Sequence, residues 1–526
     1  MDDYIVGIDL GTTYSCLAYI DASGSVKIEK NSEGDETTPS AIIFDGDNYT
    51  VGRTAKRMAS LCPEGFVDMM KRDMGTDRVR TINGQDYTPS KLSAIILKSL
   101  IDGFNANHEC SIKRAVISVP AYFGDAEREA TIYAGKIAGL DEVSLIPEPV
   151  AASIAYGVLD AKSEAMNILV YDLGGGTFDA TILRINGTNY TTLSVDGDKY
   201  LGGKDWDSRL IDLIIDKIAD DPSNNLSRED LEDDSEVRMS LKMDAETLKK
   251  DLTNMPKIRG TLRCGPINVA YTITREEFET ITRDLLMTTI EISKNSIERS
   301  GLTESDIDLI VLVGGSSRMP QVKTIMEQEF PNIKFKIYNP DLAVAEGAAL
   351  YSVAKILNDT SEESETKAIK EEYGDVLKQM PPVSVTTVLP KSYGVSAIYL
   401  DESRIFNILF RNTAVPIERS DRFYVRYDNQ THILVEIYEN ESYMPDDGEA
   451  EPLFPEDCGE PIGRFEIELP SNTMAGEPVD VTMSITDDKN LFCTVVCRGC
   501  TNEFELKYRA MHQTSEDLMR ERESLN

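Results

Sequence analysis

Apolar and polar positions follow two different patterns along the chain. Up to about residue 355, short apolar runs alternate with segments in which apolar residues recur at helical spacing. The runs that predict buried strands are 5–9, 114–119, 167–173 and 308–315, and the helical segments are 126–139, 207–220 and 275–301. Strands that alternate with helices indicate an α/β fold with partly parallel sheets.

The pattern changes near residue 383, where short alternating stretches separated by turn residues replace the helical spacing. Such stretches predict an all-β module, most simply a sandwich. They are 384–389, 404–410, 422–427, 432–438, 464–469, 479–485 and 491–497. We therefore expect an α/β domain at 1–356, an acidic connector and linker at 357–382, a β-sandwich at 383–508, and a short C-terminal helix or tail at 509–526.

Two segments of the α/β region repeat one another. VGIDLGTTYSCLAYID begins at Val6 and ILVYDLGGGTFDATIL begins at Ile168. Each is an apolar strand that ends in Asp-Leu-Gly, followed by a Gly/Thr turn and a second apolar strand. Asp9 and Asp172 are equivalent, 163 residues apart, so the repeat predicts a duplicated unit with two facing halves.

The paired turns favour phosphate binding. Glycines let backbone N–H groups approach a phosphate chain, and threonine hydroxyls add donors. An Asp at the end of each strand can hold a hydrated Mg²⁺. One such turn could be an ordinary tight turn, whereas two matched turns indicate a nucleotide site. A third glycine element, Leu312–Arg318, follows a buried strand and could hold the nucleoside.

Charge and cysteine content narrow the function classes. The chain has 91 acidic and 54 basic residues, a net charge of −37, which argues against nucleic-acid binding. It has neither a run of 18 apolar residues nor a basic, apolar start, so we expect a cytoplasmic protein without a membrane span. Cys493, Cys497 and Cys500 could bind zinc or be reduced strand cysteines. With three His and no second CxxC pair, the strand interpretation is favoured.

Several motifs together resemble those of the DnaK-type family of seventy-kilodalton heat-shock chaperones, over about residues 3–510. They are IDLGTTYS (8–15), VPAYFGDAEREAT (119–131), EPVAASIAYG (148–157), YDLGGGTFD (171–179), LGGKDWD (201–207), VGGSSRMP (313–320) and NPDLAVAEGAA (339–349). The resemblance implies an actin-like two-lobed ATPase domain, a linker, a β-sandwich that grips extended apolar peptides, and a helical lid.

The resemblance also implies a site for ATP or ADP with Mg²⁺. The residues implied to contact the nucleotide are Gly11, Thr12, Thr13, Tyr14, Gly174, Gly175, Gly176, Gly202, Gly203, Glu246, Lys249, Lys250, Thr253, Gly314, Gly315, Ser316, Arg318 and Asp341. The implied catalytic residues are Lys71, Glu148, Asp172 and Thr177, and Asp9 and Asp172 are implied to hold Mg²⁺ through bound water. Taken alone, Lys71 and Glu148 could be ordinary surface residues.

In the β module the resemblance implies a peptide groove lined by Val395, Ile398, Phe423, Ile433 and Val435, with Arg426 in the arch over the peptide. Each apolar position could instead be a core residue of a sandwich. Pro120 and Arg128 match a relay between the two domains. The implied partners are unfolded or client polypeptides, a J-domain co-chaperone and a nucleotide-exchange factor.

The sequence departs from the family pattern in four places, one of which is Arg426, where the family has a small arch residue. The stretch 380–386 has two prolines and no leucine where the family has a leucine-rich linker, which predicts weak linker docking. Ser144, Pro147 and Val150 differ from the family near the co-chaperone surface, which predicts weak stimulation by a J-domain protein. After residue 508 we expect one short helix in place of the family's helical lid.

These observations favour an ATP-dependent chaperone that hydrolyses ATP, binds extended apolar segments and assists folding. A nucleotide-controlled scaffold of the same fold, with weak or specialised client binding, is the alternative. A small-molecule kinase of this fold is disfavoured by the Lys71 and Glu148 pair and by the dedicated β module. Filament formation is disfavoured by the net charge.

Overall fold

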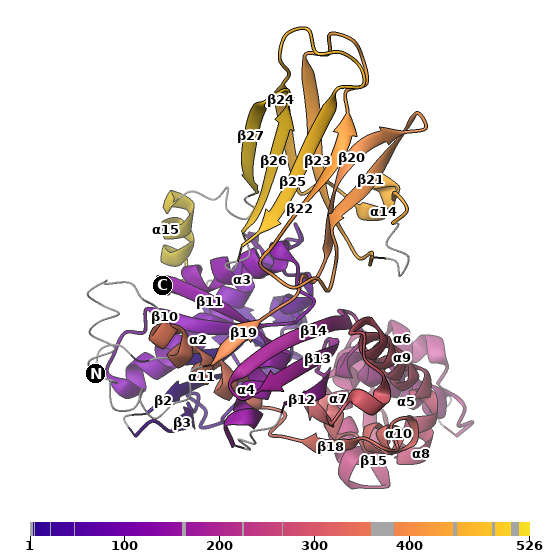
Figure 1. Cartoon of the computed structure of the whole chain (residues 1–526). Helices are drawn as coiled ribbons and strands as arrows, with labels where there is room; N and C mark the ends of the chain where they lie inside the picture. Colours follow the sequence, from indigo (N-terminus) through magenta and orange to yellow (C-terminus); the bar gives the residue numbers. More distant parts are fainter. Residues whose placement is uncertain are drawn as a thin grey trace.

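A computed structural model describes residues 4, 6–21, 23–46, 48–159, 165–223, 226–265, 267–358, 383–444, 450–486, 490–506 and 515–525. Residues 4–358 form an α/β part, and residues 390–506 form a β part that stands on one side of it (Figure 1). The acidic connector and linker expected at 357–382 lies almost wholly outside the described residues. Among the described residues, no helix is long and apolar enough to cross a membrane.

Two six-stranded sheets with matching strand order form the centre of the α/β part. The first contains β1 (Val6–Asp9), β2 (Tyr14–Ile20), β3 (Val26–Ile28), β4 (Thr38–Pro39), β10 (Arg114–Val119) and β11 (Glu142–Pro147). The second contains β12 (Met166–Leu173), β13 (Phe178–Asn186), β14 (Asn189–Asp198), β17 (Leu309–Val313), β18 (Lys334–Ile337) and β19 (Ser384–Thr386). The orders β11-β10-β1-β2-β3 and β18-β17-β12-β13-β14 are equivalent, with the same parallel and antiparallel pairings, as the sequence repeat predicts.

Helices pack between and around these sheets. Those of the first half are α1 (Arg53–Met58), α2 (Pro89–His108), α3 (Asp125–Ile137) and α4 (Glu148–Leu159). Those of the second half are α5 (Gly203–Ala219), α6 (Arg228–Asp233), α7 (Ser235–Asn254), α8 (Arg275–Ile281), α9 (Arg283–Arg299), α10 (Pro320–Glu329) and α11 (Ala343–Asn358). One core joins α4 and α11 to strands of both sheets. A Cβ at Gly7 would lie 2.1 Å from the backbone N of Ala349, so glycine lets β1 and α11 approach closely.

Short elements complete the α/β part. They are β5 (Ala41–Asp45), β6 (Asn48–Val51), β7 (Phe66–Asp68), β8 (Arg80–Ile82), β9 (Gln85–Tyr87), β15 (Lys257–Cys264), β16 (Ile267–Thr274) and the 3₁₀ turns Pro63–Gly65, Met70–Asp73, Glu304–Asp306 and Gly315–Arg318. The predicted strands and helices of this part are confirmed to within a few residues at most ends, except that the single helix predicted at 275–301 is two helices, α8 and α9, separated at Thr282. The predictions succeed because these strands are continuous apolar runs and the apolar residues of these helices recur at helical spacing.

The β part consists of two four-stranded antiparallel sheets that share one apolar core. One sheet has the order β21 (Glu402–Leu409), β20 (Ser392–Tyr399), β23 (His432–Asn440), β24 (Gly463–Glu468). The other has the order β22 (Ile417–Tyr424), β25 (Pro478–Ile485), β26 (Leu491–Cys497), β27 (Cys500–Leu506). A short helix, α14 (Pro455–Cys458), follows β23, and α15 (Ser515–Glu523) lies near the C-terminal end of the described chain.

Two strand predictions in this region are wrong. The stretch 384–389 is expected in the β module, yet β19 pairs in parallel with β14 and so extends a sheet of the α/β part. A strand is expected at 422–427, whereas β22 begins at Ile417 and includes the polar residues 418–422. β19 is a strand because it pairs with the edge of β14, and β22 is a strand because it pairs with β25. The apolar pattern within one segment does not reveal such a partner.

The linker prediction is wrong as well. Instead of docking weakly, the segment after the two prolines is held on the α/β part: the Ser384 N–H donates to the Thr188 carbonyl at 3.0 Å, and Val383 is buried in the core. Val388 is buried in the core of the first sheet. The two valines supply the apolar contacts that the absent leucines do not.

Candidate nucleotide site

The residues expected at the nucleotide converge on one cavity of about 730 Å³ between the two halves of the α/β part. The expected residues that line it are Asp9, Gly11, Thr12, Thr13, Tyr14, Lys71, Glu148, Asp172, Gly174, Gly175, Thr177, Gly203, Glu246, Lys249, Lys250, Thr253, Gly314, Gly315, Ser316, Arg318 and Asp341. Gly176 and Gly202 do not line it, although their neighbours Gly175 and Gly203 do; the two glycines pack on each other, since a Cβ at Gly202 would meet the backbone of Gly176 within 2.7 Å. Residues from several separate segments of the chain therefore share one space.

The two glycine turns touch each other at one end of the cavity. A Cβ at Gly175 would lie 1.7 Å from the Thr13 hydroxyl oxygen, so no larger residue fits there. The Thr13 hydroxyl is buried and has no hydrogen-bond partner among the described residues. A buried donor without a partner is costly, so this hydroxyl fits a ligand oxygen in the cavity.

Three carboxylates and one ammonium group gather beside these turns. Lys71 ion-pairs with Glu148, and both side chains are buried. Ser118 donates a hydrogen bond to Asp9 Oδ1 at 2.7 Å. Burial, together with the neighbouring Glu148, raises the pKa of Asp9 to about 7, although Lys71 acts in the opposite direction. Burial, Glu148 and Asp9 raise the pKa of Asp172.

This charge balance fits a divalent cation. One lysine faces Asp9, Glu148 and Asp172, so the cluster carries a surplus of negative charge in a buried place. Carboxylate oxygens are the ligands that Mg²⁺ uses, with water completing its shell. Among the described residues there is no group of three or more His, Cys, Asp or Glu side chains arranged to hold a metal directly. That finding concerns direct ligands, and it agrees with Asp9 and Asp172 holding Mg²⁺ through bound water.

The other end of the cavity is built around Glu246 on α7. Its carboxylate accepts hydrogen bonds from the Tyr14 hydroxyl at 2.9 Å and from Lys250 Nζ at 2.8 Å. Lys56 Nζ on α1 ion-pairs with it at 2.7 Å. Burial opposes the charged form, but Lys56 and Lys250 hold the pKa of Glu246 well below its usual range.

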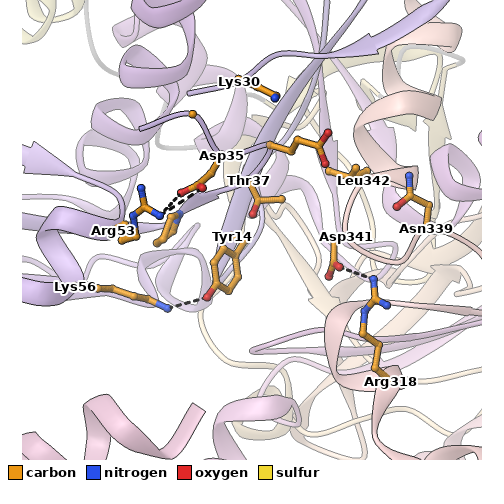
Figure 2. Close-up of a pocket in the computed structure, with 13 residues that line it drawn as sticks. Tyr14, Lys30, Asp35, Thr37, Arg53, Lys56, Arg318, Asn339, Asp341 and Leu342 are labelled. Atoms are coloured by element: carbon orange, nitrogen blue, oxygen red, sulfur yellow. Dashed lines mark hydrogen bonds and ion pairs between the residues drawn. The ribbon is translucent and has the colours of Figure 1, made fainter. Parts of the chain in front are cut away.

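Two further ion pairs complete this end. Lys249 is buried, pairs with Asp207 at 2.8 Å and donates to the Gly203 carbonyl at 2.7 Å. Arg318 pairs with Asp341 at 2.6 Å. An adjoining pocket of about 750 Å³ shares Tyr14, Arg318 and Asp341 with the cavity (Figure 2). Figure 2 shows Tyr14 beside Lys56 and opposite the Arg318–Asp341 pair, at the place where the two spaces meet.

The sequence interpretation did not identify three residues at this site. Lys56 joins α1 to α7 through Glu246. Arg72 Nε donates to the Gly176 carbonyl at 2.8 Å, and Arg72 Nη2 pairs with the Asp205 carboxylate at 2.9 Å. Asp179 ends the second turn motif and is buried, and burial, Glu148 and Asp172 raise its pKa. Asp179 could have been found as the last residue of YDLGGGTFD, whereas the other two lie outside the repeated motifs.

The apolar residues expected at the peptide groove have different environments. Val395 and Val435 are buried in the core of the β part, which agrees with the core interpretation for those two. Phe423 and Ile433 pack at the edge of that core. Ile398 is 52% exposed. The prediction of a groove therefore depends on Phe423, Ile433 and Ile398.

Arg426 joins two loops at the end of the β part. It pairs with Asp401 at 2.7 Å, and its guanidinium lies over the Tyr427 ring. Asp401 belongs to the turn between β20 and β21, and Arg426 to the loop after β22. The pair therefore spans from one four-stranded sheet to the other.

The expected relay residues lie where the two parts meet. Pro120 directly follows β10, and Arg128 lies in the first turns of α3. Tyr393 of the β part donates to Asp125, three residues before Arg128, at 3.0 Å. A Cβ at Gly124 would lie 2.8 Å from Glu439 of the β part. The positions thus adjoin the interface, and their relay role stays a prediction.

The comparison with protein families agrees with this geometry. A family model described as Hsp70 protein matches residues 5–517. The chain belongs to the Hsp70 family. Hsp70-family proteins are ATPases with a chaperone-type function, and they generally bind ATP or ADP with Mg²⁺, client polypeptides and co-chaperones. The match covers almost the whole chain, and it does not favour the scaffold alternative.

Proposed function

We propose that this Hsp70-family chain is a Mg²⁺-dependent ATP-hydrolysing chaperone. ATP occupies the cavity between the two lobes of the α/β part, and extended apolar client segments bind the β part, a sandwich. The observation that carries the proposal is the convergence of both glycine turns, Asp9, Asp172, Lys71 and Glu148 on one cavity.

Lys71 and Glu148 supply the groups that hydrolysis needs. Glu148 can accept a hydrogen bond from a water molecule and hold it in line with the γ-phosphorus, while Lys71 stabilises negative charge on the phosphoryl oxygens. The water oxygen bonds to the γ-phosphorus as the bond to the β–γ bridging oxygen breaks, and the released proton passes towards Glu148. Mg²⁺, held through water by Asp9 and Asp172, would neutralise phosphate charge. The turns around Thr13 and Gly175 supply phosphate donors.

The second glycine turn is connected to the β part through β13 and β14. β13 begins directly after that turn and pairs with β14. At the end of β14, the Val195 N–H donates to Asn412 Oδ1 at 3.0 Å, and Asp196 pairs with Arg411 at 3.6 Å. β19 covers the other end of the same strand. A movement of the turn on hydrolysis therefore has a short, packed route to the β part.

Client binding is supported by exposed apolar side chains at the end of the β part remote from this interface. Leu400 is 82% exposed, and Ile398, Tyr424, Tyr427 and Leu434 are at least half exposed. Two of them, Leu400 and Tyr427, are next in sequence to the members of the Arg426–Asp401 pair. Exposed apolar groups gathered in this way are typical of a peptide-binding surface. Because Arg426 is already paired, we expect apolar segments as clients without a requirement for acidic residues.

ATP turnover by the full-length chain tests the proposal, with and without an extended apolar peptide. Lys71→Ala should lower turnover by at least about a hundredfold, because one stabilising donor at the reacting phosphate is lost. Lys323→Ala, which changes a surface lysine paired with Glu327, is the matched control and should leave turnover unchanged. Peptide should raise turnover a few-fold.

The outcomes separate the parts of the proposal. Normal turnover by Lys71→Ala would show that the catalytic assignment is wrong. Turnover that depends on Lys71 but ignores peptide would leave the ATPase in place and contradict client coupling, and the scaffold function would then be preferred.

A further inference from the structure

Two cysteines face each other across the turn between β26 and β27. The turn is Cys497-Arg498-Gly499-Cys500, and the strand register pairs Cys497 directly with Cys500. Arg498 and Gly499 have φ values of 48° and 80°, as the two-residue hairpin turn of type I′ requires. Directly opposite residues point to the same face with Cα atoms about 4.5–5.5 Å apart, which lies within the range that disulfides bridge.

The two thiols differ in access. Cys497 is buried and Cys500 is exposed. Burial raises the pKa of the Cys497 thiol, Glu477 acts in the same direction, and the Arg498 guanidinium opposes them. Cys500 is therefore the thiol that meets a reagent first, and Cys497 is placed to react second. Among the described residues no group of three or more His, Cys, Asp or Glu side chains is arranged to hold a metal here.

The pair lies in the same row of the sheet as a candidate groove residue. Phe423 pairs with Val479, Val479 pairs with Cys497, and Cys497 pairs with Cys500. All four side chains point to the inner face of the sheet, because directly opposite residues share a face. The Phe423 ring lies 5.7 Å from that of Phe406 in the other sheet. Cys497 on β26 is thus two strands away from Phe423 on β22.

Hydrogen bonds form a second connection. Arg498 Nη1 donates to the carbonyls of Ser471 and Asn472 at 3.4 and 3.0 Å. The loop that carries these carbonyls is bonded in turn to the loop after β22, since the Asn429 N–H donates to the Thr473 carbonyl at 2.7 Å. That second loop carries Arg426. The turn, the intervening loop and the arch over the groove are therefore linked in series.

We propose that Cys497 and Cys500 form a reversible disulfide, and that its formation slows the release of peptide from the groove. The Cys500 thiolate attacks a low-molecular-weight disulfide, which releases one small thiol and leaves a mixed disulfide. The Cys497 thiolate then attacks the Cys500 sulfur and displaces the second small thiol. The two protein thiols lose two electrons and two protons, and the small disulfide gains them. The closed turn holds Arg498 against the loop at 471–472 and so restrains the arch.

Disulfide mapping tests the first half of this proposal without reference to peptide. Full-length protein is equilibrated with oxidised and reduced glutathione, free thiols are alkylated, and peptides are identified by mass. We expect a 497–500 disulfide in the wild type and in Cys458→Ser, a stable mixed disulfide at Cys500 in Cys497→Ala, and no oxidation of Cys497 in Cys500→Ser. A wild-type protein that keeps glutathione on Cys500, or keeps both thiols free, would overturn the proposal.

Peptide release tests the second half, which rests on the proposed client binding. Dissociation of a fluorescent apolar peptide should be at least about twofold slower from the oxidised protein. A reductant should restore the rate, and Cys500→Ser should show the reduced rate throughout. Equal rates in both states would overturn control of the groove. If the reduced protein binds no peptide, both the proposed client binding and its regulation by the disulfide are contradicted. Mass spectrometry still decides independently whether the disulfide forms.

Discussion

At the residue scale, the Lys56–Glu246 ion pair is one of the contacts that join the two halves of the α/β part beside the cavity, together with the Tyr14–Glu246 hydrogen bond. The ammonium and carboxylate groups are 2.7 Å apart, and both side chains are mostly buried. Loss of one partner of such a pair costs about 1–2 kcal/mol, or about 5–30-fold in a rate constant. We therefore expect Lys56→Ala to release ADP about 5–30-fold faster, because Glu246 keeps only Lys250 and Tyr14.

Stopped-flow release of a fluorescent ADP analogue measures this prediction. Lys98→Ala is the control, because Lys98 pairs with Asp102 within α2 and lines neither the cavity nor the adjoining pocket that Lys56 lines. An unchanged release rate in Lys56→Ala would mean that the pair does not limit nucleotide escape.

The residues of the cavity differ in how far the sequence could reveal them. Asp9 and Asp172 follow from the repeat, because the same strand-turn-strand unit occurs twice. Lys71 and Glu148 needed the family resemblance, since neither lies in a repeated segment. Neither the repeat nor the resemblance could identify Lys56. It is an isolated lysine on a short helix, and its pairing with Glu246 depends on how α7 packs against that helix.

At the element scale, β19 shows what a linker strand requires in order to dock. Val383 is 4% exposed in the core that α4 and α11 share, and the backbone of β19 pairs with β14. Full burial of a valine contributes about 1.5–3 kcal/mol, and an unpaired carboxylate would reverse that gain. We expect Val383→Asp to release β19 and to abolish stimulation of ATP turnover by peptide.

Hydrogen exchange measures this release directly. The amides of Ser384–Thr386 should exchange at least about tenfold faster in Val383→Asp, since a loss of 1.4 kcal/mol is tenfold in an opening equilibrium. Val79→Asp, at a valine that is 50% exposed, is the matched control and should leave their exchange unchanged. Preserved protection of β19 in Val383→Asp would contradict the role given to Val383.

β19 also illustrates which strands could not be predicted from the sequence. β17 is apolar along its whole length and β12 is apolar except for Asn167 and Asp172, so the pattern identifies both strands without knowledge of their neighbours. β22 is mostly exposed and polar, and β19 has three residues; both are strands because an edge is free beside them. Patterns within one segment carry no information about such an edge.

At the scale of the whole molecule, charged contacts help to hold the β part on the α/β part, beside the hydrogen bonds of Asn412 and Tyr393. Arg411 is buried, donates to the Val195 carbonyl at 3.3 Å, and pairs with Asp196 and with Glu441. Arg299 also pairs with Asp196 and stacks on Tyr443. Separately, α15 docks on the α/β part, where Arg522 donates to the Lys136 and Leu140 carbonyls. The sequence could not predict either contact, because each joins segments that are remote in the chain.

Reversal of the charge at Arg411 should separate the two parts. Arg411→Glu places a carboxylate against Asp196 and Glu441 in a buried place, where like charges repel and the carbonyl of Val195 loses its donor. A compact chain of this length has a radius of gyration of about 24 Å. X-ray scattering should give a value several ångströms larger for Arg411→Glu, with peptide stimulation lost but basal ATP turnover retained, because the cavity is untouched. Arg422→Glu, at an exposed arginine paired within the β part, should stay compact. A compact Arg411→Glu protein that still responds to peptide would show that Arg411 is not needed to couple the two parts.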